Sequence, residues 1–126
     1  MDVQKSDIDR RRFHRYVVDY PISYNLKDQP ELFTGIAMNL SQGGLLACFF
    51  DRIHVGSELD LEMFCTLELQ FTSLNVLARI AWKDIMETSE AIEYQYGLEF
   101  IRIDREEKNK LLRLLTSINP AFSYQS

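Results

Sequence analysis

Four arginines stand close together near the start of the chain, at positions 10, 11, 12 and 15. A guanidinium group binds phosphate through two parallel hydrogen bonds, matches the O6 and N7 atoms of guanine in the same way, and stacks on aromatic planes. One short arginine segment can therefore hold both parts of a guanine nucleotide. The alternative is a solvated basic arm that contacts nothing, because basic runs are common.

A second polar segment, Asn-Leu-Ser-Gln-Gly-Gly at 39–44, separates two apolar runs. Asn39 and Ser41 are two residues apart, so in a strand both point away from the core face that holds Leu40. We expect them to present an amide and a hydroxyl on an exposed surface, while Gly44 permits a positive φ and lets a flat ligand approach the backbone. A plain hairpin turn is the alternative, since Asn, Ser and Gly favour turns for local reasons.

Alternating apolar residues predict a mainly β-strand protein that positions these two segments. The expected strands cover residues 20–24, 36–41, 45–49, 57–63, 76–82 and 96–100. Pro21 has no N–H for a strand ladder, so the first strand should begin there or lie at a sheet edge. Trp82 follows Val76, Ala78 and Ile80 at a period of two, and we therefore expect it in the core. Cys48 and Cys65 lie in apolar contexts and are also expected to be buried.

The apolar period changes near the end of the chain and predicts a helix over 104–118. Asp104 suits the N-cap, and Glu107 is expected to reach back to it in a capping box. Glu106 and Lys110 have the i,i+4 spacing of a favourable ion pair. Asn119 and Pro120 then end the helix.

These elements predict one all-β domain over residues 1–126. We expect a flexible arginine-rich arm at 1–16, a small antiparallel barrel at 17–103, and a helix at 104–118 that covers an edge or an open end. A length of 126 residues, with 46% apolar and 26% charged residues, is typical of one soluble globular domain.

Composition also excludes several classes of protein. No run approaches the roughly 18 apolar residues of a membrane span, and the first residues lack the apolar region of a secretory signal. Two cysteines are too few for a disulfide scaffold and favour a cytoplasmic location. Two histidines and two cysteines suggest no zinc site of the usual four-ligand kind. We expect no membrane insertion, metal or cofactor.

The charge distribution bears on the partner. Net charge is −5, and residues 21–126 alone carry nine basic and fifteen acidic groups. Such an acidic body repels DNA and RNA, whereas a local arginine cluster suits a small, compact anion. The acidic row at 58, 60 and 62 points outward along one strand and is interpreted as a solvated face. No nucleophile elbow, phosphate-binding glycine loop or acid–base pair is evident, so we expect no enzyme.

Taken together, the two polar segments resemble the PilZ domain family. The pattern Arg11-Arg12-x-x-Arg15 is followed, roughly 25 residues later, by Asn39-x-Ser41-x-x-Gly44. The resemblance continues through residues 80–83, 96–100 and the closing helix, and covers about residues 9–116. It implies a six-stranded antiparallel β-barrel and a bacterial receptor for the second messenger cyclic di-GMP.

The resemblance also implies residue roles. Arg11 and Arg15 are expected to bind phosphate and guanine with support from Arg12. Asn39, at a position where many members carry Asp, and Ser41 are expected to hydrogen-bond a guanine. The expected ligand-binding residues are Arg10, Arg11, Arg12, Arg15, Asn39, Ser41, Gly43 and Gly44. In the family, an arginine at position 10 accompanies binding of two intercalated ligand molecules, so one or two per chain remain open.

A single domain without an output module is expected to relay its signal to a partner protein. We hypothesise that ligand bridges the arm to the 39–44 turn and orders the arm. The alternative is a nucleotide-insensitive interaction adaptor with the same fold. The partner, its pathway, the affinity and the oligomeric state cannot be read from the sequence.

Overall fold

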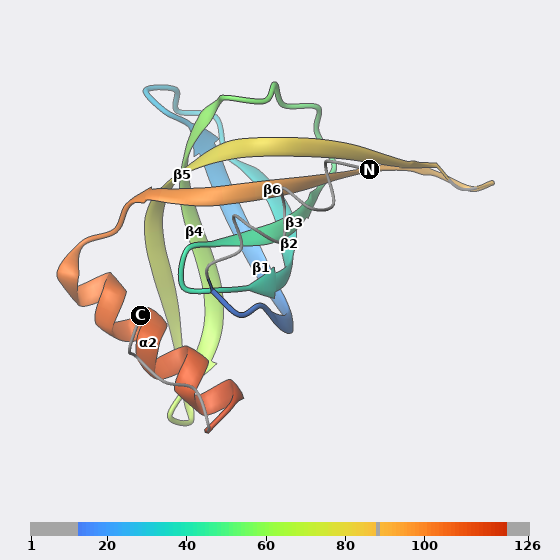
Figure 1. Cartoon of the computed structure of the whole chain (residues 1–126). Coiled ribbons are helices and arrows are strands. Elements are labelled where there is room, and N and C mark those ends of the chain that lie inside the picture. Colours follow the sequence, from blue (N-terminus) through green and yellow to red (C-terminus); the bar gives the residue numbers. More distant parts are fainter. Residues whose placement is uncertain (1–12, 88, 121–126) are drawn as a thin grey trace.

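Six antiparallel strands close into a barrel in the order β1-β2-β3-β6-β5-β4, as Figure 1 shows. The computed structural model describes residues 13–87 and 89–120, so most of the predicted arm lies outside the described residues. The elements are β1 (Tyr16–Leu26), β2 (Phe33–Leu40), β3 (Gly44–Phe49), β4 (Glu58–Leu67), β5 (Gln70–Glu87), β6 (Ile92–Arg102) and α2 (Arg105–Ile118). The predicted all-β fold with a C-terminal helix is confirmed.

The first strand is longer than predicted and contains Pro21 in its interior. β1 begins at Tyr16 and pairs with β2 from the Tyr16–Leu40 partners onward. On its other side β1 pairs with β4 only from Ile22. The missing N–H of Pro21 therefore lies where one edge of the strand is open, which is where a sheet tolerates proline.

Three aromatic rings pack against one another in the core of the barrel. The ring centroid of Phe49 lies 4.2 Å from that of Tyr24 and 4.8 Å from that of Tyr96. The Tyr96 hydroxyl donates to the Asp51 carbonyl and accepts the Ile53 N–H, both at 2.9 Å. Burial raises the pKa of the Tyr96 hydroxyl, so it remains a neutral donor that fixes the loop after β3 onto the barrel.

A bulge in β5 and the regular alternation of β3 each overturn a prediction about which residues face the core. In β5 the partners change from Ile80–Leu98 to Trp82–Gly97, which leaves Ala81 as an extra residue. This β-bulge turns Trp82 to the outside of the barrel, where its indole covers Gly97. The expectation of Trp82 in the core was wrong. Cys48 is only half-buried, so its predicted burial was also wrong, whereas Cys65 is buried.

Helix α2 lies beside β4 and β5 and covers one side of the barrel (Figure 1). Leu111, Leu114 and Leu115 are its buried residues and belong to the same core as the strands. The apolar stripe predicted from Leu111, Leu112, Leu115 and Ile118 is confirmed for Leu111 and Leu115, while Leu114 is buried in place of the half-buried Leu112.

The predicted capping box and ion pair of α2 are wrong. Asp104 is the N-cap residue but forms no side-chain capping hydrogen bond. Glu107 instead accepts the Asn75 backbone N–H at 2.8 Å and pairs with Lys110 at 3.1 Å. Lys110 also donates to the Ser73 carbonyl at 2.5 Å. Both side chains therefore attach the helix to β5.

Candidate functional site

The turn between β2 and β3 is organised from within by Ser41. Its N–H donates to the Gly44 carbonyl at 2.8 Å. Its hydroxyl donates to the same carbonyl and accepts the Gly43 N–H, both at 3.2 Å. Ser41 is only 7% exposed, so the expectation of a hydroxyl displayed on the surface was wrong. The hydroxyl holds the turn in shape and so positions its neighbours.

Gly44 permits close packing of two strands rather than an unusual backbone angle. Among the described glycines only Gly56 has a positive φ. A Cβ on Gly44 would overlap the backbone carbonyl oxygen of Leu98 on β6. The neighbouring Gly43 is also hydrogen-bonded to β6, because the Phe100 N–H donates to the Gly43 carbonyl at 2.9 Å. The predicted reason for this glycine was therefore wrong, while its contact with a ligand stays a prediction.

Asn39 presents an unsatisfied acceptor beside this turn. The partners of β3 pass from Ala37 to Asn39, so Met38 is an extra residue in β2. This bulge places Ala37 and Leu40 in the core, whereas Met38 is exposed. The Asn39 Oδ1 atom is buried and has no hydrogen-bond partner among the described residues. A buried acceptor without a donor costs about 1–3 kcal/mol, so this atom suits a ligand that brings an N–H group.

The residues paired across the strands form a continuous outer row beside Asn39. Asn39 pairs with Val17 on β1 and Leu46 on β3, Leu46 pairs with Gly97, and Gly97 pairs with Trp82. Directly paired residues share one face of a sheet. The adjacent row, which comprises Leu40, Leu45, Leu98 and Ile80, is buried inside the barrel. We call the outer row of Val17, Asn39, Leu46, Gly97 and Trp82 the platform.

The chain arrives at this turn directly from the arginine segment. The Phe13 ring lies against Gly43, where a Cβ would be only 2.9 Å from Phe13 Cδ2. Arg15 is half-buried just before β1. The structure does not describe Arg10, Arg11 and Arg12. Phe13, the first described residue after Arg12, contacts the turn at Gly43.

Sequence reasoning missed Phe13 and the outward position of Trp82. Phe13 had one usable signal, an apolar residue inside a basic run. The alternation of side chains gave no signal for Trp82. Ile80 and Trp82 are two residues apart and would share a face, and only the bulge at Ala81 places them on opposite faces. Gly97, directly opposite, was the available clue, since a glycine inside a strand often marks a close approach of another group.

A charged pair lies next to the turn on the same outer surface. Gly44 pairs with Glu99, and Glu99 pairs with Arg79. The Arg79 guanidinium donates to Glu99 Oε1 through Nε at 2.9 Å and through Nη2 at 2.6 Å. Both side chains are about half exposed, so this pair contributes little to stability. It leaves the surface beside Gly44 with an arginine that Glu99 holds in place.

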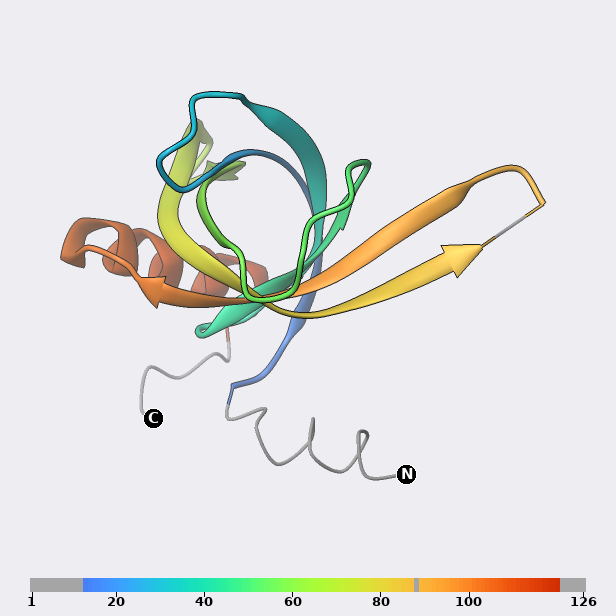
Figure 2. The same ribbon diagram turned by 90° about the horizontal axis from the view of Figure 1, so that it is seen from above.

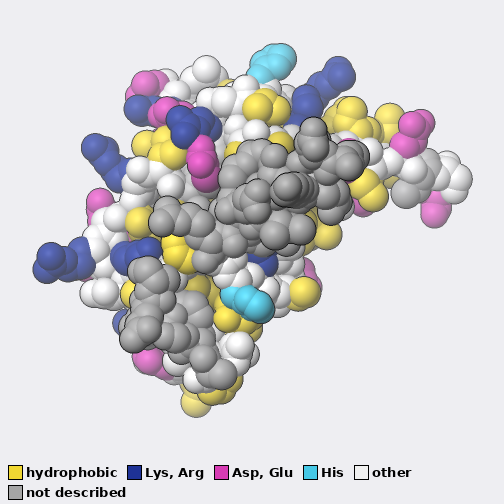
Figure 3. Space-filling view, in the orientation of Figure 1, with side chains coloured by type: hydrophobic (Ala, Val, Ile, Leu, Met, Phe, Trp, Pro, Cys, Tyr) yellow, Lys and Arg dark blue, Asp and Glu magenta, His cyan; other side chains and the backbone are white. Residues whose placement is uncertain are grey.

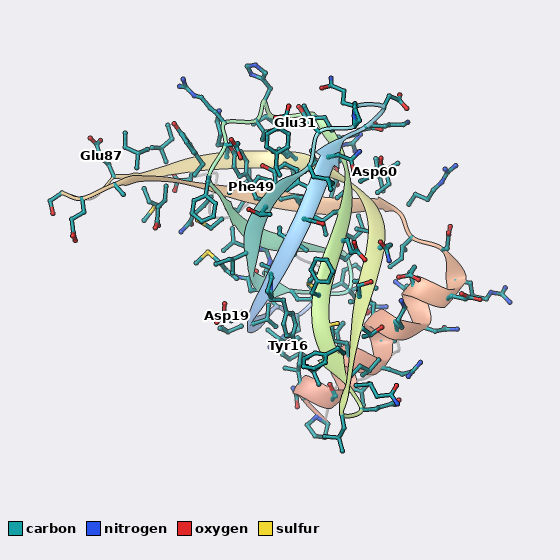
Figure 4. The ribbon with its side chains drawn as sticks, turned by 180° about the vertical axis from the view of Figure 1, so that it is seen from behind. Tyr16, Asp19, Glu31, Phe49, Asp60 and Glu87 are labelled. Carbon is teal, nitrogen blue, oxygen red and sulfur yellow. The ribbon has the colours of Figure 1, made fainter. Side chains whose placement is uncertain are left out.

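A shallow hollow on the other side of the barrel has the wrong chemistry for an anion. It lies over β1, β4 and β5 and is lined in part by Asp60, Glu62 and Asp104. Figure 4 shows Asp60 in this region, away from the turn. Carboxylates repel phosphate, although Lys27 and Arg102 also line the hollow. In the described part of the chain, no cluster of three or more His, Cys, Asp or Glu residues could hold a metal ion. Within the same residues, none of the helices has the length and apolarity to cross a membrane.

This barrel, with a polar turn between its second and third strands, defines a known class of domain. The family model described as PilZ domain matches residues 9–117. The chain therefore belongs to the PilZ domain family. A search of curated proteins returns no significant match.

Solved structures of similar fold come from several bacteria. The PilZ domain of Escherichia coli YcgR with c-di-GMP is 16% identical, with a TM-score of 0.67 over 88% of this chain and 92% of that one. The Bacillus subtilis inhibitor of motility MotI/DgrA is 16% identical, with a TM-score of 0.68 over 90% of this chain and 54% of that one. The K. pneumonia MrkH–c-di-GMP complex is 13% identical, with a TM-score of 0.69 over 86% of this chain and 51% of that one. The chain thus spans about half the length of MotI/DgrA and MrkH.

Proposed function

We propose that this chain is a non-enzymatic receptor for cyclic di-GMP and binds it between the arginine segment and the platform. The unsatisfied Asn39 Oδ1 atom beside the turn is the observation that most supports this function. The N1–H and N2–H groups of guanine are the donors that such an acceptor lacks. Two structures of similar fold, the PilZ domain of YcgR and MrkH, are complexes with c-di-GMP.

The arginines supply the other half of the site in this proposal. Arg11 and Arg15 bind phosphate and guanine, Arg12 supports them, and Arg10 accompanies a second ligand molecule. Phe13, seated on Gly43, brings this segment to the turn. Each charge-assisted hydrogen bond contributes about 1.5–3 kcal/mol, so one arginine accounts for roughly tenfold to more than a hundredfold in affinity.

Calorimetric titration of cyclic di-GMP tests the binding, with GTP and linear di-GMP as controls. The variant is Arg11→Ala/Arg15→Ala, and the matched control is Arg102→Ala/Arg105→Ala, which removes two arginines outside the site. We expect selective binding by the wild type and the control and none by the variant. The midpoint of the heat curve gives one or two ligands per chain. A folded wild type that binds no cyclic di-GMP would contradict the proposal and favour the nucleotide-insensitive adaptor.

The signal reaches a partner protein, in this proposal, through ordering of the arm. Ligand that bridges the arginines to the turn would restrict the segment that reaches the turn at Phe13. Hydrogen exchange along residues 8–16, measured with and without ligand, is expected to slow on binding. Equal exchange rates at saturating ligand would exclude this relay and leave the receptor role intact.

A further inference from the structure

Strands β5 and β6 continue past the barrel as a two-stranded ribbon. β5 pairs with β4 only as far as Arg79, and β6 pairs with β3 only as far as Tyr94. Beyond these points the two strands pair with each other out to Glu87 and Ile92. Figure 2 shows this segment projecting well away from the barrel, and we call residues 83–87 with 92–95 the ribbon. Within the described residues a third strand pairs with the ribbon only at its base, where Cys48 and Phe49 of β3 pair with Gln95 and Tyr94.

One face of the ribbon is apolar and exposed. Ile85 pairs with Tyr94 and Glu87 pairs with Ile92, so these four side chains share a face. Ile85 is 48% exposed and Ile92 is 57% exposed. Isolated two-stranded ribbons are marginally stable in water unless a third layer covers their apolar side. Exposed isoleucines on such a ribbon therefore indicate a surface that a partner completes.

The rim of this apolar face is acidic. Between residues 83 and 93 the sequence has four acidic residues and one lysine, for a local charge of −3. Asp84 and Glu93 are exposed on the opposite side, and Glu87 stands at the far end, as Figure 4 shows. In the space-filling view the projecting end combines hydrophobic with Asp and Glu side chains (Figure 3). Charge complementarity favours a basic partner.

A partner would bind the face of the ribbon rather than its β5 edge. The Asp84 carboxylate accepts the Ile85 N–H at 2.9 Å, so a side chain already occupies that backbone donor. A charged residue at this place discourages addition of another strand along β5. The isoleucines on the face have no comparable cover among the described residues.

We propose that the ribbon docks a partner protein through a basic segment that also contains apolar side chains. The apolar side chains pack on Ile85 and Ile92, and lysines or arginines of the partner lie against Glu87, which shares this face. This surface goes beyond the nucleotide site and does not depend on it, because Ile85 and Ile92 lie outside the platform and the turn.

A random peptide display library selected on the purified chain provides the probe. We expect the enriched peptides to combine Lys or Arg with Leu, Ile, Val or Phe. In calorimetry, the best of them should bind Ile85→Ser/Ile92→Ser at least about tenfold more weakly than the wild type, and binding should weaken with salt. The matched control is Leu32→Ser/Phe71→Ser, which removes two exposed apolar side chains elsewhere and should bind normally.

A charge exchange makes the test independent of any loss of folding. Glu87→Lys should weaken binding of the basic peptide and strengthen binding of a version of it with Lys and Arg replaced by Glu. Equal binding by the ribbon variant and the wild type would overturn the proposal. A wild type that forms a dimer by ultracentrifugation, and a ribbon variant that is a monomer, would also overturn it, because a second copy would then be the occupant. Cyclic di-GMP titration of the ribbon variant should be unchanged, so this proposal and the proposed receptor function can fail separately.

Discussion

The Phe13 ring lies directly on Gly43, with Cδ2 and Cε2 at 2.9 and 3.0 Å from where a Cβ on residue 43 would stand. The glycine thus provides the space in which the segment from the arginines meets the turn. Gly44, its neighbour, faces the Leu98 backbone of β6 instead. Two adjacent glycines of one motif therefore have different tasks: one seats the arm and the other lets two strands approach.

Alanine substitution should separate these two tasks. Gly43→Ala should leave the free energy of unfolding within about 1 kcal/mol of the wild type, because the Phe13 ring can move, and should weaken cyclic di-GMP binding about tenfold. Gly44→Ala should destabilise the fold by about 2 kcal/mol or more, because a Cβ would overlap the Leu98 carbonyl, which cannot move freely. Urea unfolding and calorimetry of both variants give the two quantities. Equal loss of stability in both would contradict the assignment.

Asn39 should be more important for binding than for stability. Its Oδ1 atom is buried without a donor in the part of the chain that the structure describes, which costs free energy in the unbound protein. Asn39→Ala should therefore change the free energy of unfolding by less than about 1 kcal/mol, or raise it, while weakening cyclic di-GMP binding about tenfold or more. Thermal unfolding with and without ligand checks this. A large loss of stability with unchanged affinity would show that Asn39 serves the fold.

Much of the barrel could be predicted from the sequence because side chains along a half-buried strand alternate between the core and the solvent. Leu59, Leu61 and Met63 are all buried, as their period of two required. The alternation failed where an extra residue enters a strand. Ile36 and Met38 have the same parity as Leu40, yet only Leu40 is buried, because the bulge at Met38 shifts the register. A bulge depends on the partner strand, and that information is not local in sequence.

The position of the candidate site could likewise be predicted from the sequence, but the tasks of its individual residues could not. The spacing of Asn39, Ser41 and Gly44 located the turn, since these residues favour turns wherever they occur. Their individual tasks depended on what lies opposite, such as the Leu98 carbonyl behind Gly44 and the Phe13 ring on Gly43. Those contacts join residues 30 to 54 positions apart. Side-chain patterning along one strand does not encode them.

Trp82 should report ligand binding by fluorescence. It is the only tryptophan in the chain, and the β5 bulge places it on the platform with Asn39. A nucleotide bound on this surface should change the intensity or the wavelength of its emission. Titration with cyclic di-GMP should give a saturable change that GTP does not give. Arg11→Ala/Arg15→Ala should abolish the change, and emission that stays constant while calorimetry detects binding would place the ligand away from the platform.

The turn between β4 and β5 should give a pH-dependent contribution to stability. Glu68 and Leu69 both have positive φ, at 53° and 67°, a conformation that costs non-glycine residues roughly 1–2 kcal/mol. Arg113 of α2 binds Glu68 at 2.8 Å, and this hydrogen bond and charge lower the pKa of the Glu68 carboxyl from its ordinary value of 4.5. Because the folded pKa lies below the unfolded one, the pair stabilises the protein above about pH 4.5 and loses its effect as the pH falls through the folded value.

Arg113→Ala should therefore return the pKa of Glu68 toward 4.5, measured by carboxyl-carbon NMR titration. The wild type should be slightly more stable than the variant at neutral pH, and this difference should shrink at about pH 3, where both states bind the proton. The effect is small because both side chains are largely exposed and solvent screens them. Arg105→Ala, at the start of the same helix, is the control and should leave the Glu68 titration unchanged. A stability difference that grew as the pH fell would contradict a lowered pKa, because that sign requires a carboxyl that is protonated more readily in the folded state.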